Sequence, residues 1–226
     1  MYYMNFNSDW HLQTQNSDYL DLSINRLSSP ILMWVSQITD IINRNIENFD
    51  NSEIQINDIG CNVGHFYRNI SEINRKVKYT GFDISETYLD IGRSHFPEAS
   101  FVNEDVGGKN FNVSKYECDI SVISATLEHI DDYETFLKNI FDSTKLFVIL
   151  RTFIGEESLK EFCLKPGASQ SYLIRQFTLD DLKSKSFNLG WETEVIQDNA
   201  TEGKEKEVCE KILRTQKIIS FKNSDI

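Results

Sequence analysis

The stretch DIGCNVG, residues 58–64, combines one acid with two glycines and an asparagine. Asp58 is the acid, and Gly60 and Gly64 stand on either side of Asn62. Glycines in a turn after a strand let the backbone approach a ligand closely, and an acid at the end of the next strand can hold both hydroxyls of a ribose. Asp83 stands at that second place. The combination predicts a site for a nucleoside cofactor.

The glycine spacing distinguishes between such cofactors. The dinucleotide fingerprint G-x-G-x-x-G would require glycines at positions that this sequence fills with Asn62 and His65. The spacing therefore disfavours a pyrophosphate site and a nicotinamide dehydrogenase.

Strand-like and helix-like segments alternate along the chain. Strands separated by helices of this length form a mostly parallel sheet that is covered on both faces, so the pattern predicts a doubly wound α/β fold. Two later segments, 191–196 and 214–221, are expected to form an antiparallel pair that closes a seven-stranded sheet. The other expected strands are 53–59, 77–83, 99–105, 118–124 and 145–153, and the expected helices are 64–74, 85–95, 131–141 and 178–189.

The region before the first strand contains PILMWVSQITDIINRNI, residues 30–46, which has the periodicity of an amphipathic helix. At 226 residues, the chain is long enough for one sizeable core. We therefore predict an N-terminal helical cap over residues 1–50 and a cofactor-binding domain over residues 51–226.

The motifs in this order resemble the class I S-adenosylmethionine-dependent methyltransferases, which have a Rossmann-like sheet. DIGCNVG resembles their first motif, with Asn62 in the place of the middle glycine. The substitution is mild, because Asn tolerates a positive φ better than most residues. The resemblance covers about residues 54–150, together with the pattern at 177–191.

The resemblance implies S-adenosylmethionine as cofactor and assigns roles to further residues. The segment GFDIS places Asp83 and Ile84 in the ribose-binding motif, and NEDV makes Asp105 the acid that contacts adenine. SATLEHIDD, which begins at Ser124, resembles the segment after the fourth strand. The predicted cofactor-binding residues are Asp58, Gly60, Asn62, Gly64, Asp83, Ile84, Asp105 and Ser124. Each also has a simpler interpretation: the glycines could only form a tight turn, Asp83 could cap a helix, and Asp105 could be a solvated turn residue.

His129 is the candidate general base. A sulfonium is already a good leaving group, so the protein mainly has to orient the methyl acceptor, and a base is needed only when that acceptor arrives protonated. An imidazole titrates near neutral pH and can accept a proton from a hydroxyl. The alternative for His129 is a packing role beneath the cofactor.

Arg151, Tyr172 and Arg175 are predicted to line the methyl-acceptor side. Arginine suits carboxylates and phosphates, although ion pairs with Glu156, Glu157 or Asp180 would account for the arginines equally well. The segment LRTF, 150–153, lacks the Asp-Asn pair of the magnesium-dependent catechol methyltransferases. We therefore predict no metal.

Composition limits the partners. The formal net charge is −12, which opposes binding to phosphate backbones and to anionic lipid surfaces. The longest apolar run, LFVIL at 146–150, is far too short to span a membrane. We expect a cytoplasmic protein that binds a small molecule, without nucleic acid or membrane partners.

The sequence therefore predicts a methyltransferase that acts on a small acceptor, anionic or sugar-like, and methylates oxygen. An N-methyltransferase and a non-catalytic S-adenosylmethionine-binding partner subunit are the alternatives.

Overall fold

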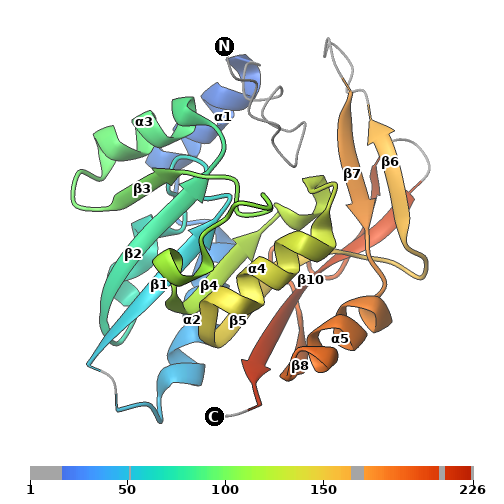
Figure 1. Cartoon of the computed structure of the whole chain (residues 1–226). Coiled ribbons are helices and arrows are strands. Elements are labelled where there is room, and N and C mark those ends of the chain that lie inside the picture. The colour runs from blue at the N-terminus through green and yellow to red at the C-terminus, as the bar shows by residue number, and fades with distance from the viewer. Residues whose placement is uncertain (1–16, 51, 164–170, 209–211, 225–226) are drawn as a thin grey trace.

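The computed structural model describes residues 17–50, 52–163, 171–208 and 212–224. In these residues, one large sheet runs through the middle of the molecule, with helices on both faces (Figure 1). Its strand order is β3-β2-β1-β4-β5-β10-β8, and β9 pairs with β10. The strands are β1 (Glu53–Ile59), β2 (Lys76–Asp83), β3 (Ser100–Asn103), β4 (Cys118–Ser124), β5 (Thr144–Ile154), β8 (Trp191–Gln197), β9 (Glu205–Val208) and β10 (Ile212–Asn223).

Strand direction agrees with the prediction. The five strands from β3 to β5 are parallel, whereas β10 is antiparallel to β5 and to β8. The predicted doubly wound, mostly parallel, Rossmann-like sheet with an antiparallel last strand is therefore confirmed. Because β9 adds to the edge of β10, the described sheet has eight strands instead of the predicted seven.

Strand β5 shows why the central strands are apolar throughout. Phe147 and Ile149 pack into a cluster with α2, and Val148 and Leu150 pack into a second cluster with α4. Since both faces are covered, the strand is a continuous apolar run without alternation. The described helices are α1 (Ser17–Ser28), α2 (Met33–Ile46), α3 (Glu86–His95), α4 (Tyr133–Ser143) and α5 (Leu179–Asn188), with short 3-10 turns η2 (Tyr67–Glu72), η3 (Val113–Tyr116) and η4 (Leu127–His129).

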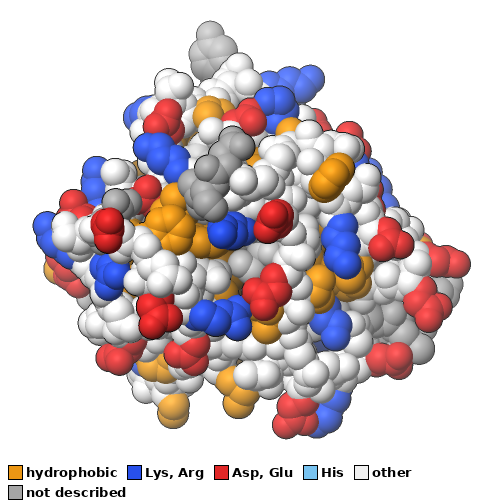
Figure 2. Space-filling view, turned by 90° about the horizontal axis from the view of Figure 1, so that it is seen from below, with side chains coloured by type: hydrophobic (Ala, Val, Ile, Leu, Met, Phe, Trp, Pro, Cys, Tyr) orange, Lys and Arg blue, Asp and Glu red, His pale blue; other side chains and the backbone are white. Residues whose placement is uncertain are grey.

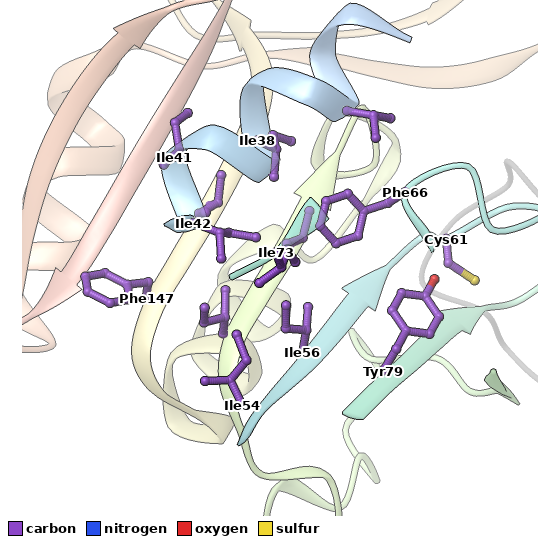
Figure 3. Close-up of a cluster of buried hydrophobic side chains, with 14 of the residues drawn as sticks. Ile38, Ile41, Ile42, Ile54, Ile56, Cys61, Phe66, Ile73, Tyr79 and Phe147 are labelled. Carbon is purple, nitrogen blue, oxygen red and sulfur yellow. The ribbon is translucent and has the colours of Figure 1, made fainter. Parts of the chain in front are cut away.

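The two N-terminal helices have different surroundings. Ile38, Ile41 and Ile42 of α2 lie on the sheet beside Ile54 and Ile56 of β1 (Figure 3). No described residue of α1 belongs to the hydrophobic clusters. Within the predicted cap over residues 1–50, α2 is thus a layer of the sheet domain, and residues 1–16 lie outside the described part.

The helix predicted over residues 64–74 is wrong. Gly64 has a φ of +88°, which no right-handed helix allows, and the following residues form the 3-10 turn η2. A 3-10 turn places side chains three positions apart on one face, and this face buries Phe66 and Asn69. The side-chain amide of Asn69 donates a 3.0 Å hydrogen bond to the hydroxyl of Thr39 on α2. Packing against α2 therefore overrides the helical pattern.

A hairpin that the sequence analysis did not predict follows β5. It consists of β6 (Leu159–Cys163) and β7 (Tyr172–Gln176), which form a separate two-stranded sheet. The hairpin stands above the end of β5, next to the top of α4 (Figure 1). Phe177 connects it to β5 through a bridge to Ile154. The hairpin adds a wall at the edge where the parallel strands end.

The described surface carries both signs of charge. Lys and Arg side chains alternate with Asp and Glu side chains over the face seen from below, without a continuous basic field (Figure 2). No helix among the described residues is long and apolar enough to cross a membrane.

The packing of α2 predicts a stability effect. Replacing Ile42, which is fully buried, with Ala should lower the free energy of unfolding by roughly 2–5 kcal/mol, because the change leaves a cavity in the core. Urea denaturation measures the change. Met33→Ala in the same helix is the matched control, since Met33 is 59% exposed and should cost little. Equal stability of the two variants would contradict the placement of α2 in the core.

Candidate active site

A cavity of about 770 Å³ lies at the carboxyl edge of the parallel strands. Its volume is in the range of pockets that enclose small ligands and cofactors. The lining comes from α1 and α2, from the turns after β1, β2 and β4, from the end of β5, and from the β6–β7 hairpin. The carboxyl edge of an open α/β sheet is where ligands bind in such folds.

The turn after β1 has the backbone that its sequence predicts. Gly60, Asn62 and Gly64 all have positive φ, at +73°, +52° and +88°. The side chain of Asn62 accepts a 2.8 Å hydrogen bond from the backbone N–H of Val63, a local contact that supports this conformation. The prediction that Asn62 takes a conformation usual for glycine is confirmed.

Gly60 and Gly64 leave no room for a side chain, because other parts of the protein pack closely against them. A Cβ at Gly60 would stand 2.1 Å from Oγ1 of Thr126, and one at Gly64 would stand 2.9 Å from the ring of Phe101. Thr126 is the residue that links the turn after β4 to β1, because its hydroxyl lies 3.2 Å from the carbonyl oxygen of Ile59. Gly60 also lines the cavity, whereas Gly64 does not.

Asp58 lies beneath the glycine turn. Its carboxylate accepts a 2.8 Å hydrogen bond from the hydroxyl of Tyr79, and the residue is 4% exposed. Burial raises the pKa of Asp58 to about 7, although the Tyr79 hydrogen bond opposes this shift. Asp58 lines the floor of the cavity.

Asp83 connects two turns. One carboxylate oxygen accepts a 2.9 Å hydrogen bond from the backbone N–H of Asn62, and the other accepts one of the same length from Ser85. Burial raises the pKa of Asp83 to about 6, and the backbone hydrogen bonds lower it. Each oxygen keeps further lone-pair capacity, so the carboxylate can accept hydroxyl donors from a ligand in the cavity.

A buried hydroxyl without a partner lies at the same end. The hydroxyl of Tyr88, on α3, has no hydrogen bond within the described part of the chain. Its electrostatic neighbours include Tyr19 of α1 and Asp83. Tyr88 does not line the cavity itself, so its hydroxyl belongs to the packing behind the cavity wall. The Asp83 carboxylate at this end suits a polar, hydroxyl-bearing ligand such as a nucleoside.

The remaining predicted cofactor residues also come together. Ile84, Asp105 and Ser124 all line the cavity; Ile84 and Asp105 follow β2 and β3, and Ser124 is the last residue of β4. One oxygen of Asp105 accepts a 3.0 Å hydrogen bond from the backbone N–H of Gly107, which fixes the carboxylate at the cavity wall. Val106, which the sequence analysis did not single out, adds a buried apolar contact beside it.

His129 lies at the end of η4, opposite the β6–β7 hairpin. Its Nδ1 is 2.9 Å from the carbonyl oxygen of Leu173, and its ring is 5.7 Å from the ring of Tyr172. A carbonyl oxygen can only accept, so Nδ1 carries the proton and the neutral ring has its lone pair on Nε2. His129 and Tyr172 both line the cavity. The tautomer is therefore suitable for a proton acceptor.

Glu128 is almost fully buried next to His129. One of its oxygens accepts a 3.0 Å hydrogen bond from the hydroxyl of Thr152 on β5. This contact ties η4 to the end of β5, which agrees with a role in orienting neighbouring groups.

Arg151 and Arg175 have different environments. Arg151 is 7% exposed, lines the cavity and forms an ion pair with the fully buried Asp198. Arg175 does not line the cavity; its guanidinium donates to the carbonyl oxygens of Ile130 and Asp131. The geometry favours a structural role for Arg175. The acid that pairs with its guanidinium is Asp131, and not Glu156, Glu157 or Asp180.

Several lining residues were not foreseen. Tyr19, Ser23, Trp34, Lys206 and Gln216 reach the cavity from α1, α2, β9 and β10. Nothing in their local sequence identifies them, because they come from elements far from the motifs. No group of three or more potential metal ligands occurs among the described residues.

The contact between Gly60 and Thr126 predicts a large stability loss on Gly60→Ala. The added Cβ would clash with Thr126. The alanine would also have to keep the left-handed backbone conformation of Gly60, which alone costs about 1–2 kcal/mol. Gly190→Ala is the matched control, since Gly190 has a φ of +81° and nothing within 4 Å of an added Cβ. Chemical denaturation should show a larger loss for Gly60→Ala, partly relieved when Thr126→Ala is added. Equal losses in both alanine variants would remove the steric argument.

Comparisons with known proteins agree with this geometry. A family described as a methyltransferase domain matches residues 57–145. The malonyl-[acyl-carrier protein] O-methyltransferase of Bacillus anthracis is 23% identical over 114 residues, which are 49% of this chain and 41% of that protein. The match thus spans less than half the length of the curated relative.

Solved structures share the fold over nearly the whole chain. A S-adenosylmethionine-dependent methyltransferase from Clostridium acetobutylicum superposes with a TM-score of 0.61 at 13% identity, covering 91% of this chain and 96% of that one. Magnesium protoporphyrin IX methyltransferase from Synechocystis, solved with bound S-adenosylmethionine, gives a TM-score of 0.58 at 12% identity, with coverages of 93% and 94%. The resemblance inferred from the motifs is confirmed: residues 57–145 match a methyltransferase domain, and the fold is the one found in S-adenosylmethionine-dependent methyltransferases of known structure.

Proposed function

We propose that this protein transfers a methyl group from S-adenosylmethionine to an oxygen atom of a small acceptor that is anionic or sugar-like. The observation that carries the proposal is that Asp83, Asp105 and His129 all line one cavity. When bound, S-adenosylmethionine supplies a methyl group on a sulfonium, which is a good leaving group. The protein's task is then to bind both molecules and to orient them.

The acidic end of the cavity supports the cofactor assignment. Asp83 would accept the ribose hydroxyls, and Asp105 would contact the adenine. Ile84 and Val106 would supply apolar contacts to the base. Asp58, Gly60, Asn62 and Ser124 would enclose the rest of the cofactor, while Gly64 would act by shaping the turn.

The opposite end of the cavity supports proton removal by His129. The carbonyl oxygen of Leu173 accepts from Nδ1, so a neutral ring would carry its lone pair on Nε2. Tyr172 packs against the imidazole and restricts its rotation. A hydroxyl of the acceptor within reach of Nε2 would lose its proton as the methyl group is transferred.

Two other functions use the same cavity. An N-methyltransferase would need no base if its amine arrived neutral, and a non-catalytic partner subunit would bind S-adenosylmethionine without turnover. Calorimetry with S-adenosylhomocysteine, followed by a screen of small acids and phosphorylated sugars for methylated products, tests all three. The location in the cytoplasm and the absence of nucleic-acid partners stay predictions.

The role of Asp83 predicts a loss of cofactor binding in Asp83→Ala. Hydrogen bonds to a charged group contribute roughly 1.5–3 kcal/mol each, so S-adenosylhomocysteine should bind at least tenfold more weakly. The variant also leaves two backbone N–H groups without partners, so its folding is checked by circular dichroism and a denaturation curve. Asp180→Asn, an exposed change on α5, is the control. A folded Asp83→Ala protein with normal affinity would exclude the ribose assignment.

The role of His129 predicts a kinetic defect without a binding defect. In His129→Asn the side-chain amide can still donate to Leu173, but the nitrogen that accepts the proton is gone, so kcat should fall by roughly 10²–10⁴. S-adenosylhomocysteine affinity should stay within twofold of the wild type. The assay follows S-adenosylhomocysteine release with an acceptor identified by the screen.

The pH profile distinguishes a base from a packing residue. Wild-type kcat should fall on the acid side as the imidazole becomes protonated and can no longer accept a proton. His129→Asn should lack that limb. If both proteins keep the same acid limb, His129 is not the base, and the acceptor reacts in an already deprotonated form.

A further inference from the structure

The guanidinium of Arg151 is held in place from one side only. Its Nε and Nη2 donate to the two carboxylate oxygens of Asp198, at 3.3 and 3.0 Å, and Nη2 also donates to Oε1 of Gln216 at 2.7 Å. Nη1 has no hydrogen bond within the described part of the chain and is not enclosed by it. Since Arg151 lines the cavity, two N–H donors of Nη1 remain for a ligand.

Gln216 adds a second pair of donors. Its Oε1 accepts from Arg151, so the orientation of the amide is fixed and its Nε2 group must point the other way. Nε2 also lacks a bond to the described residues, and Gln216 lines the cavity although it is only 7% exposed. Two NH₂ groups from neighbouring strands thus stand at one wall.

A supporting structure fixes this arrangement. Asp198 is fully buried and also accepts from Ala200 N–H and from the hydroxyl of Thr201, at 3.3 and 2.8 Å. Gln37 of α2 clamps the turn that carries Asp198, donating to the carbonyl oxygen of Gln197 and accepting from the backbone N–H of Asn199. A buried ion pair is costly to desolvate, and apolar residues could fill the same space. Because this ion pair lies beside the cavity, we infer that it serves to fix the guanidinium of Arg151 at the cavity wall.

Most of the charged groups along the cavity are separated by sign. The acids Asp58, Asp83, Glu104 and Asp105 lie at the ends of β1, β2 and β3, whereas Arg151 and Lys206 lie at β5 and β9. A third cation of the lining, Arg26, belongs to α1. Glu128 is the acid nearest to the basic side, and Thr152 donates to one of its oxygens. Asp198 offsets the charge of Arg151, and the exposed Lys206 adds a second cation at this side.

Apolar side chains surround the donors. The guanidinium carbon of Arg151 is 5.8 Å from the ring centre of Trp34, and the ammonium of Lys206 is 5.8 Å from the ring centre of Phe153. Tyr172 and Ile174 of β7 complete the apolar wall. A ligand at this end therefore meets oxygen-binding donors beside aromatic and aliphatic surface.

We propose that Arg151 and Gln216 bind the carboxylate of the methyl acceptor, and that the acceptor is a small carboxylic acid with an aromatic or aliphatic body. Two NH₂ groups match the two oxygens of a carboxylate. The neutral amide of the same acid would present an NH₂ group to these donors and would bind worse. This inference rests on the methyl-transfer function proposed above, but carboxylate recognition can be measured without turnover.

The test compares carboxylic acids with their amides. Benzoate, phenylacetate, cinnamate and succinate, each paired with its amide, are titrated calorimetrically into the wild-type protein with and without saturating S-adenosylhomocysteine. At least one acid should bind tenfold or more tightly than its amide. If every acid and its amide bind equally, or none binds, the proposal is overturned. A protein that fails to bind S-adenosylhomocysteine but still prefers an acid would contradict the methyl-transfer function alone.

The decisive variant is Gln216→Glu. It keeps the size of the side chain and the oxygen that accepts from Arg151, but replaces the NH₂ group with a second oxygen that repels a carboxylate. Affinity for the preferred acid should fall at least tenfold, while affinity for S-adenosylhomocysteine stays within twofold. Gln55→Glu, on the exposed side of β1, is the matched control and should change neither. Unchanged acid binding in a folded Gln216→Glu protein overturns the proposal.

Arg151 is tested in a variant that removes its counter-ion as well. Arg151→Met alone leaves Asp198 buried without its partner, so that protein could fail to fold. In the double variant Arg151→Met, Asp198→Leu both charges are removed, and the preference for acid over amide should disappear. A double variant that folds, binds S-adenosylhomocysteine and still prefers the acid would show that Arg151 is not the binding group.

Discussion

Five parallel strands end at one edge of the sheet, and the site depends on that constraint. Residues that are far apart in the chain line one cavity because each lies at or near the carboxyl end of a strand: Asp58 on β1, Asp83 on β2, Asp105 after β3, Ser124 on β4 and Arg151 on β5. Antiparallel neighbours would have sent alternate residues to opposite edges. The carboxylate of Asp83 then fixes the turns after β1 and β2 relative to each other, because it accepts hydrogen bonds from a backbone N–H group in each of them.

Burial gives these groups their chemical character. Carboxylates at the edge of the sheet lose hydration, which raises the pKa of Asp58 to about 7 and that of Asp83 to about 6. Such groups gain more from a donor or cation in the cavity than an exposed carboxylate would. At the other end, Asp198 compensates Arg151 and leaves its unused N–H groups for a ligand. The cavity therefore offers hydrogen-bond acceptors at β1 and β2 and hydrogen-bond donors at β5.

Local patterns predicted the parts of the site that follow strands. The motifs that contain Asp58, Asp83 and Asp105 predicted residues that line one cavity, and the conformation of Asn62 could be predicted because few other residues tolerate it. The patterns failed where packing decides. Helical periodicity over residues 64–74 could not reveal that Asn69 binds Thr39, and nothing near Arg151 indicates Asp198 or Gln216, which are 47 and 65 positions away. Contacts between residues so far apart in the sequence are determined by the order of the strands in the sheet, and the local periodicity of the sequence does not reveal them.

Helix α2 links stability to the cavity. One face buries Ile38 and Ile42 against the sheet, while Trp34 and Gln37 of the same helix contact Arg151 and the turn that holds Asp198. A helix that only covered the cofactor could move away without disturbing the core. Because α2 is anchored by several buried side chains, a shift of the wall that it contributes would also disturb the core. The described residues of α1 and of the β6–β7 hairpin lie outside the two large hydrophobic clusters, so a shift of either would expose less of the core.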